Sequence, residues 1–98
     1  MKSFFDLTAS NQPVLVDFFA EWCGPCKAMP PILKEVKDRF GDSIKILKID
    51  VDKNQRLAAA INVQGVPTLI LYKNSKILWR QSGMVTKNDL ISKINEFL

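Results

Sequence analysis

The feature that most restricts the fold is a change of hydrophobic period after residue 20. Residues 14–20 form an apolar run rich in β-formers, interrupted by one acid, Asp17. Such a run is typical of a strand that is buried on both faces, in a sheet covered by helices. Apolar side chains then recur three and four positions apart, which predicts a helix that Gly41 ends: Cys26, Met29, Leu33, Val36 and Phe40. A second strand at 44–49 completes a strand–helix–strand series, which predicts a right-handed crossover between two parallel strands.

The remaining patterns predict a single α/β domain over residues 1–98. The expected elements are a capped helix at 3–9, a short helix at 57–61, a strand at 68–72, a tight turn at Asn74-Ser75, a hairpin strand at 77–81, and a helix behind a Thr86/Asp89 capping box. The order α-β-α-β-α-β-β-α predicts a small mixed sheet with helices on both faces.

Composition narrows the function classes. The 98 residues are 47% apolar and 24% charged, as in ordinary globular proteins, and no apolar run approaches the roughly 20 residues of a membrane span. Asp6 stands where a signal peptide would have its apolar middle, so we expect a cytoplasmic protein without membrane contact. The net charge of +4 comes from 14 basic residues scattered among 10 acids, which argues against nucleic-acid binding. Histidine is absent, which excludes Cys–His pairs, Ser–His triads and His-containing zinc sites.

Both cysteines lie in Trp22-Cys23-Gly24-Pro25-Cys26-Lys27, where the first strand ends and a helix begins. The unpaired N–H groups and the dipole of a helix start would stabilise a thiolate at Cys23. Pro25 fits the first turn, and Cys26, on the apolar stripe, is expected to be the more buried thiol. We therefore predict that Cys23 attacks a disulfide in a partner and that Cys26 resolves the mixed disulfide.

Two other interpretations of the cysteine pair are weaker. A structural disulfide is rare in cytosolic proteins, and so short a loop would constrain the unfolded chain little. A zinc ion would need two further ligands from elsewhere, so no metal is expected.

Asp17 is the second candidate residue. Burial among apolar neighbours should raise its pKa, as a proton acceptor working near neutral pH requires. It could take the proton of Cys26 during resolution. The simpler alternative is an acid at the sheet surface paired with Lys48, and the two interpretations are compatible.

These residues resemble the thioredoxin family. The matches are the Trp22–Lys27 motif, Asp17, Pro31, Lys48, Gly65-Val66-Pro67-Thr68 and Gly83, over a stretch from about Pro13 to the C-terminus. The resemblance implies the thioredoxin fold, with four to five strands, and the activity of a protein-disulfide reductase. Lys48 would tune the proton affinity of Asp17.

The resemblance also implies how a partner would bind. Pro67 would be cis and lie beside the cysteines, and the main chain of Val66 would pair with an extended segment of the partner. Trp22 would flank the site, Gly83 would permit close approach, and the Gly24-Pro25 dipeptide favours a reductant. Simpler interpretations are a surface aromatic for Trp22 and a strand end for Gly83. No cofactor would be bound; electrons would come from NADPH through a thioredoxin reductase and pass to disulfide-containing targets, with the chain a monomer.

Two rival functions remain open at this point: a binding or assembly module without turnover, and an oxidase or isomerase of an exported compartment. The sequence also departs from the family pattern. The first family strand has no counterpart, so the sheet would have four strands or a vestigial fifth, with Lys45 helping to protect the exposed strand at 44–49. Phe19 replaces a usual tryptophan, Pro30 before Pro31 predicts a kink, and Ser75 replaces a turn glycine.

Overall fold

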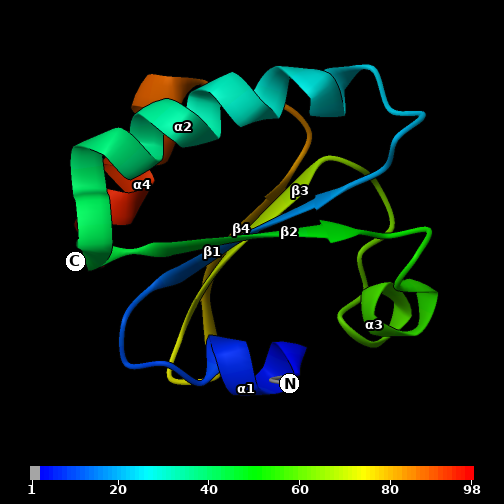
Figure 1. Cartoon of the computed structure of the whole chain (residues 1–98), viewed down its shortest axis with the longest axis horizontal. Helices are drawn as coiled ribbons and strands as arrows, with labels where there is room; N and C mark the ends of the chain where they lie inside the picture. The colour runs from blue at the N-terminus through cyan, green and yellow to red at the C-terminus, as the bar shows by residue number, and fades with distance from the viewer. Residues whose placement is uncertain (1–2) are drawn as a thin grey trace.

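The computed structural model describes residues 3–98 and shows helices and strands in the predicted order (Figure 1). The elements are α1 (Phe4–Thr8), β1 (Val14–Phe19), the 3₁₀ helix η1 (Pro25–Ala28), α2 (Met29–Phe40), the 3₁₀ helix η2 (Gly41–Ser43), β2 (Lys45–Asp50), α3 (Gln55–Ala60), β3 (Thr68–Lys73), β4 (Lys76–Ser82) and α4 (Lys87–Glu96).

The sheet is mixed and has the strand order β2-β1-β3-β4, so β1 is central and β2 lies at one edge. β1 runs parallel to β2 and antiparallel to β3, and β3 and β4 form the predicted hairpin. The predicted parallel pairing of the first two strands is confirmed. Among residues 3–98 the sheet has four strands, the smaller of the two numbers expected.

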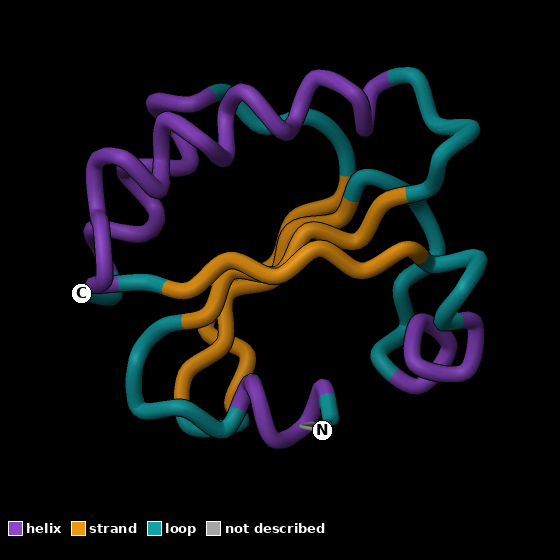
Figure 2. The backbone as a smooth tube through the Cα atoms, in the orientation of Figure 1, coloured by secondary structure: helices purple, strands orange, loops and turns teal. Residues whose placement is uncertain are grey.

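Helices cover both faces of the sheet, and Figure 2 shows the three layers. On one face, side chains of β1, β3 and α2 meet those of α4 in the larger core cluster. On the other face, Val14, Val16 and Phe18 of β1 pack with Phe4 of α1 and Ile61 at the end of α3. Successive residues of a strand point to opposite faces, so β1 supplies both cores.

The hairpin turn forms without a glycine. Asn74 and Ser75 have φ values of 52° and 67°, a left-handed backbone that most side chains avoid. Their amides donate to the carbonyl oxygens of Ser10 and Thr8 at 2.8 and 3.0 Å. Hydrogen bonds to the last residue of α1 and to the segment after it therefore help hold a turn that the sequence favours only weakly.

The two prolines mark a helix boundary. The sequence predicts one helix from Cys26 with a kink at Pro30 and Pro31, but the structure has η1 followed by α2, which begins at Met29. Both prolines lie in the first turn of α2, where a missing N–H group costs little. The structure therefore has a change from 3₁₀ to α geometry next to the two prolines, where the sequence predicted a kink within one helix.

Candidate active site

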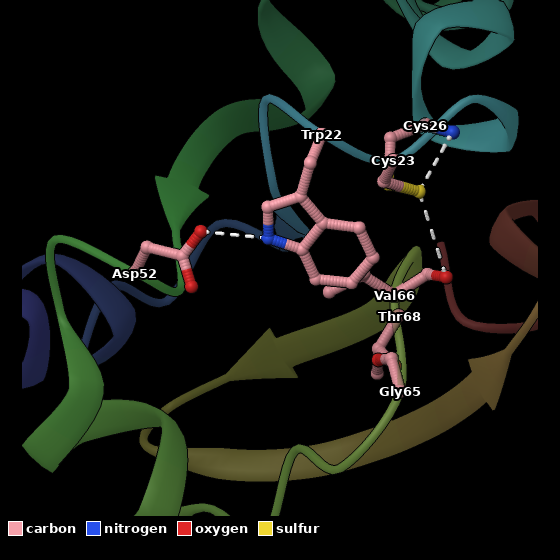
Figure 3. The surroundings of a disulfide bond; sticks show 7 residues. All are labelled: Trp22, Cys23, Cys26, Asp52, Gly65, Val66 and Thr68. Carbon is pink, nitrogen blue, oxygen red and sulfur yellow. Dashed lines mark hydrogen bonds between the residues drawn. A yellow bond between two sulfur atoms is a disulfide. The ribbon is translucent and has the colours of Figure 1, made fainter.

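Cys23 and Cys26 form a disulfide at the start of η1, with their Cα atoms 5.3 Å apart. The backbone N–H of Cys26 donates to Sγ of Cys23 at 3.1 Å (Figure 3). The same N–H would stabilise negative charge on Cys23 after reduction. Both cysteines are buried, with Cys23 3% and Cys26 5% exposed, so the expectation that Cys23 is exposed and Cys26 is the more buried thiol is not met. The backbone N–H of Cys23 donates to the Ala20 carbonyl at 3.2 Å, and Cys23 packs in one cluster with Ala20 and Cys26. Helix periodicity does not reveal this packing.

The Val66-Pro67 peptide bond is cis, as the family resemblance implies, and lies in the loop before β3. The carbonyl oxygen of Val66 is 3.7 Å from Sγ of Cys23 (Figure 3). The buried Thr68 hydroxyl donates to the Gly65 carbonyl at 2.6 Å and lies 3.0 Å from the hydroxyl of Ser82. These bonds tie the loop to the first residue of β3 and the end of β4, which fixes Val66 opposite Cys23.

Trp22 is 72% exposed beside the disulfide. Its indole Nε1 donates to a carboxylate oxygen of Asp52 at 2.8 Å, which orients the ring (Figure 3). Asp52 was missed by the sequence reasoning. A signal was present, because Trp22 and Asp52 follow the carboxyl ends of two strands predicted to be parallel neighbours, which meet at one edge of the sheet.

The remaining predicted contact residues surround the same surface. Gly24 and Pro25 are exposed, and a Cβ added at Gly24 would meet open space. Gly83 has φ +91°, and its N–H donates to the Pro67 carbonyl at 2.8 Å. Its backbone conformation thus already favours glycine, whether or not a partner approaches closely.

Asp17 shares a cavity with Cys26 beside the disulfide. A cavity of about 340 Å³ is lined by Asp17, Cys26, Lys48, Phe19 and Pro30 among others. Asp17 is 2% exposed, and its Oδ1 has no hydrogen-bond partner among the residues that the structure describes. Burial raises the pKa of Asp17 from 3.8 to about 6, against the opposing effect of the Lys48 ammonium.

Lys48 is the residue of β2 directly opposite Asp17. Within residues 3–98, however, the two side chains form no ion pair at 4.0 Å or less. Lys48 acts on Asp17 through space, so the simple paired-acid interpretation does not describe this site. No group of three or more metal-binding side chains occurs in the described part of the chain.

Comparison with known proteins agrees with this geometry. The Thioredoxin family model matches residues 2–96, and the chain belongs to the thioredoxin family. It is 39% identical to a thioredoxin of Acidithiobacillus ferridurans over 95% of this chain and 86% of the relative, and 40% identical to that of Bacillus subtilis over 96% and 90%. Thioredoxin Y of rice chloroplasts is 45% identical over 94% of this chain, which spans only 55% of the relative's length.

Solved structures show the same fold. A mutant thioredoxin of Halobacterium salinarum superposes with a TM-score of 0.86 and 34% identity, covering 99% of this chain and 87% of that one. A malaria-parasite thioredoxin-2 superposes with a TM-score of 0.85 and 37% identity, covering 88% and 84%. With its paired cysteines, the domain is a thiol–disulfide oxidoreductase, in the class of protein-disulfide reductases that thioredoxins form. None of the helices among residues 3–98 is long and apolar enough to cross a membrane.

Proposed function

We propose that this domain reduces disulfides in partner proteins, with Cys23 as the nucleophile and Cys26 as the resolving thiol. The observation that carries the assignment is the unequal surroundings of the two sulfurs. Sγ of Cys23 faces the Val66 carbonyl and accepts the N–H of Cys26, whereas Cys26 lines the cavity that contains Asp17. The first arrangement suits attack by Cys23 on a bound partner, and the second suits proton transfer from Cys26 to Asp17.

In the first step, the Cys23 thiolate attacks one sulfur of the partner's disulfide. A mixed disulfide forms, and the second partner sulfur leaves as a thiolate that takes a proton from water. The N–H of Cys26 and the start of η1 raise the thiolate fraction of Cys23 near neutral pH.

In the second step, Cys26 gives its proton to the carboxylate of Asp17 and attacks Sγ of Cys23. The Cys23–Cys26 disulfide forms, and the first partner sulfur leaves as a thiolate, so two electrons have passed to the partner. A pKa of about 6 lets Asp17 be ionised at neutral pH and still take a proton from a thiol. Lys48 tunes this affinity by favouring the ionised form.

The partner's backbone would pair with Val66 in the loop shaped by Pro67. The exposed Trp22, Gly24 and Pro25 would contact its side chains, and Gly83 would border the same surface. Burial of one face of an aromatic ring beside main-chain hydrogen bonds gives affinity with little sequence specificity.

We further propose a monomeric single domain over residues 1–98 that works in the cytoplasm and binds no cofactor itself. A thioredoxin reductase would return the disulfide to the dithiol with electrons from NADPH. The bacterial thioredoxins among the relatives support this assignment, although chloroplast proteins are also similar.

Insulin reduction driven by dithiothreitol tests the activity. Wild type should accelerate the precipitation of insulin, whereas Cys23→Ser should fall to the rate of dithiothreitol alone because no thiolate can attack. An equal rate for wild type and Cys23→Ser would disprove the reductase assignment.

A second variant tests the division of roles. Cys26→Ser should accumulate a covalent complex with a disulfide-containing target, seen as a band in non-reducing electrophoresis that dithiothreitol removes, because nothing resolves the intermediate. Cys23→Ser is the matched control and should trap nothing. Trapping by Cys23→Ser instead of Cys26→Ser would reverse the assigned roles.

A further inference from the structure

A groove of about 510 Å³ lies between α2 and the free edge of β2, outside the disulfide surface. Four of its lining residues are lysines: Lys34 and Lys37 of α2, and Lys45 and Lys48 of β2. Its other lining residues are apolar, Leu33 and Ile46 among them, and no acidic residue of the described part of the chain lines it. The groove is therefore a basic channel with an apolar base.

The backbone beside this groove has unused hydrogen-bonding groups. Among residues 3–98, β2 pairs with β1 alone. The N–H groups of Lys45 and Val51 point to β1 and bond to Pro13 and Phe19, each at 2.9 Å. Backbone direction alternates along a strand, so the N–H and C=O groups of Ile46 and Lys48 point outward.

The next outward carbonyl along β2 shows what this edge accepts. The carbonyl of Asp50 takes a hydrogen bond from the side-chain amide of Asn54 at 2.9 Å. The chain itself thus covers the end of the edge. Figure 1 shows β2 at the edge of the sheet, and no other strand among residues 3–98 pairs with the stretch at Ile46 and Lys48.

Among residues 3–98 none of the four groove lysines forms an ion pair, and the acid that interacts with one of them is Asp17, opposite Lys48. The ion pairs of the described residues involve Lys53, Lys87 and Lys93. Lys37 donates to the carbonyls of Gly41 and Ile44 at 2.7 Å each, which fixes its ammonium without cancelling the charge. Because side chains alternate along β2, Lys48 points to the α2 side with Ile46, and Lys45 points to the other face with Leu47. An anionic strand at this edge would therefore have cations on both of its faces.

We propose that the free edge of β2 binds an extended acidic segment of a partner protein as an added strand. The open N–H and C=O groups of Ile46 and Lys48 would supply the ladder hydrogen bonds, and the lysines would attract carboxylates on the added strand. A second copy of the chain is disfavoured, because pairing β2 with itself would bring two sets of lysines together. The lysines would thus favour an acidic added strand over a neutral or basic one.

The probe is a cysteine-free acetylated peptide of alternating Glu and Val, added to the ¹⁵N-labelled whole chain. Binding should shift the amide resonances along β2 and slow hydrogen exchange at Ile46 and Lys48. A peptide of the same charge that is N-methylated on one edge cannot form the ladder, and it should bind at least about tenfold more weakly. Equal binding of the two peptides, or shifts centred on Val66 instead, would overturn the proposal.

Charge is tested separately. The double variant Lys34→Glu/Lys45→Glu should weaken binding about tenfold or more, and Arg56→Glu/Lys76→Glu, which changes the net charge equally at exposed sites elsewhere, should weaken it far less. Both double variants should reduce insulin at the wild-type rate. A failure of the strand-binding proposal can therefore be told apart from a failure of the reductase assignment. Equal weakening by both variants would overturn the proposal. So would protection of Ile46 and Lys48 by phosphatidylserine vesicles or by raising the concentration of the chain alone, in place of the peptide.

Discussion

The two faces of β1 differ although they belong to the same six residues. The face toward α1 and α3 presents Val14, Val16 and Phe18, which are fully buried among apolar neighbours. The face toward α2 presents Leu15, then the buried acid Asp17, then the half-buried Phe19 at the cavity beside Cys26. One face is a complete hydrophobic core, whereas the other changes from core to reactive site within three positions.

This difference shows how a small domain can hold a costly group. A buried carboxylate without a hydrogen bond to Oδ1 opposes folding when it is ionised. Because successive side chains of a strand point to opposite faces, the other face of β1 can stay apolar. Its burial there keeps the strand in place. The side chains of β1 that stabilise the fold and the one that serves the reactive site are neighbours in the sequence, but they point to opposite faces of the sheet.

The largest expected effect is on the apolar face. Phe18→Ala should lower the free energy of unfolding by about 3–5 kcal/mol, because a fully buried aromatic ring is replaced by a cavity. Urea denaturation followed by circular dichroism measures this, and insulin reduction per folded molecule should stay near the wild-type value. A loss below about 1 kcal/mol would show that this face does not anchor the strand.

Asp17→Asn should act in the opposite direction on stability. Because folding raises the pKa of Asp17 from 3.8 to about 6, the unfolded chain loses the proton more readily, and ionisation favours unfolding as the pH rises through this range. The variant should therefore be more stable than wild type by up to about 3 kcal/mol above pH 6, with the difference vanishing below about pH 4. Urea denaturation at several pH values measures this.

The same variant should slow the resolving step roughly 10- to 100-fold at neutral pH, measured as the lifetime of a mixed disulfide in stopped-flow experiments. Lys48→Met provides the comparison: the carboxyl remains but loses the nearby cation, so the pKa of Asp17 should rise above about 6. Resolution by Asp17→Asn at the wild-type rate would remove Asp17 from the mechanism.

The smallest effect is expected one residue from Phe18, on the reactive face. Phe19→Ala should change the free energy of unfolding by only about 1 kcal/mol, since Phe19 is half-buried and its loss also hydrates Asp17. The pKa of Asp17 should fall from about 6 toward 3.8, as followed by NMR of the carboxyl carbon. An unchanged pKa would mean that Phe19 does not desolvate Asp17.

Local patterns in the sequence predicted most of the fold. The apolar run at 14–20 and the Ser3 and Thr86 cap positions identified β1, α1 and α4, because each signal lies within a few residues of the element it specifies. The prolines of α2 were misjudged since the sequence does not show where 3₁₀ geometry changes to α. The hairpin turn depends on bonds to Thr8 and Ser10, more than 60 positions away in the chain, which no local pattern reveals.

The site was predicted unevenly for the same reason. The cysteines stand out by their spacing, and Asp17 by its apolar neighbours. Pro67 and Val66 came only from the family resemblance, since 40 residues separate them from Cys26. The burial of Cys23 and the Trp22–Asp52 bond depend on how loops fold over one another after the sheet has formed.

The central position of β1 has a consequence for any attempt to divide the chain. A fragment ending after β2 would contain both cysteines, Asp17 and Lys48, but β1 would lose its antiparallel neighbour and Cys23 would lose Val66. The later fragment would contain the β3–β4 hairpin and the cis proline but neither cysteine. The reactive centre therefore takes residues from both halves of the chain, and it is complete only when β3 pairs with β1.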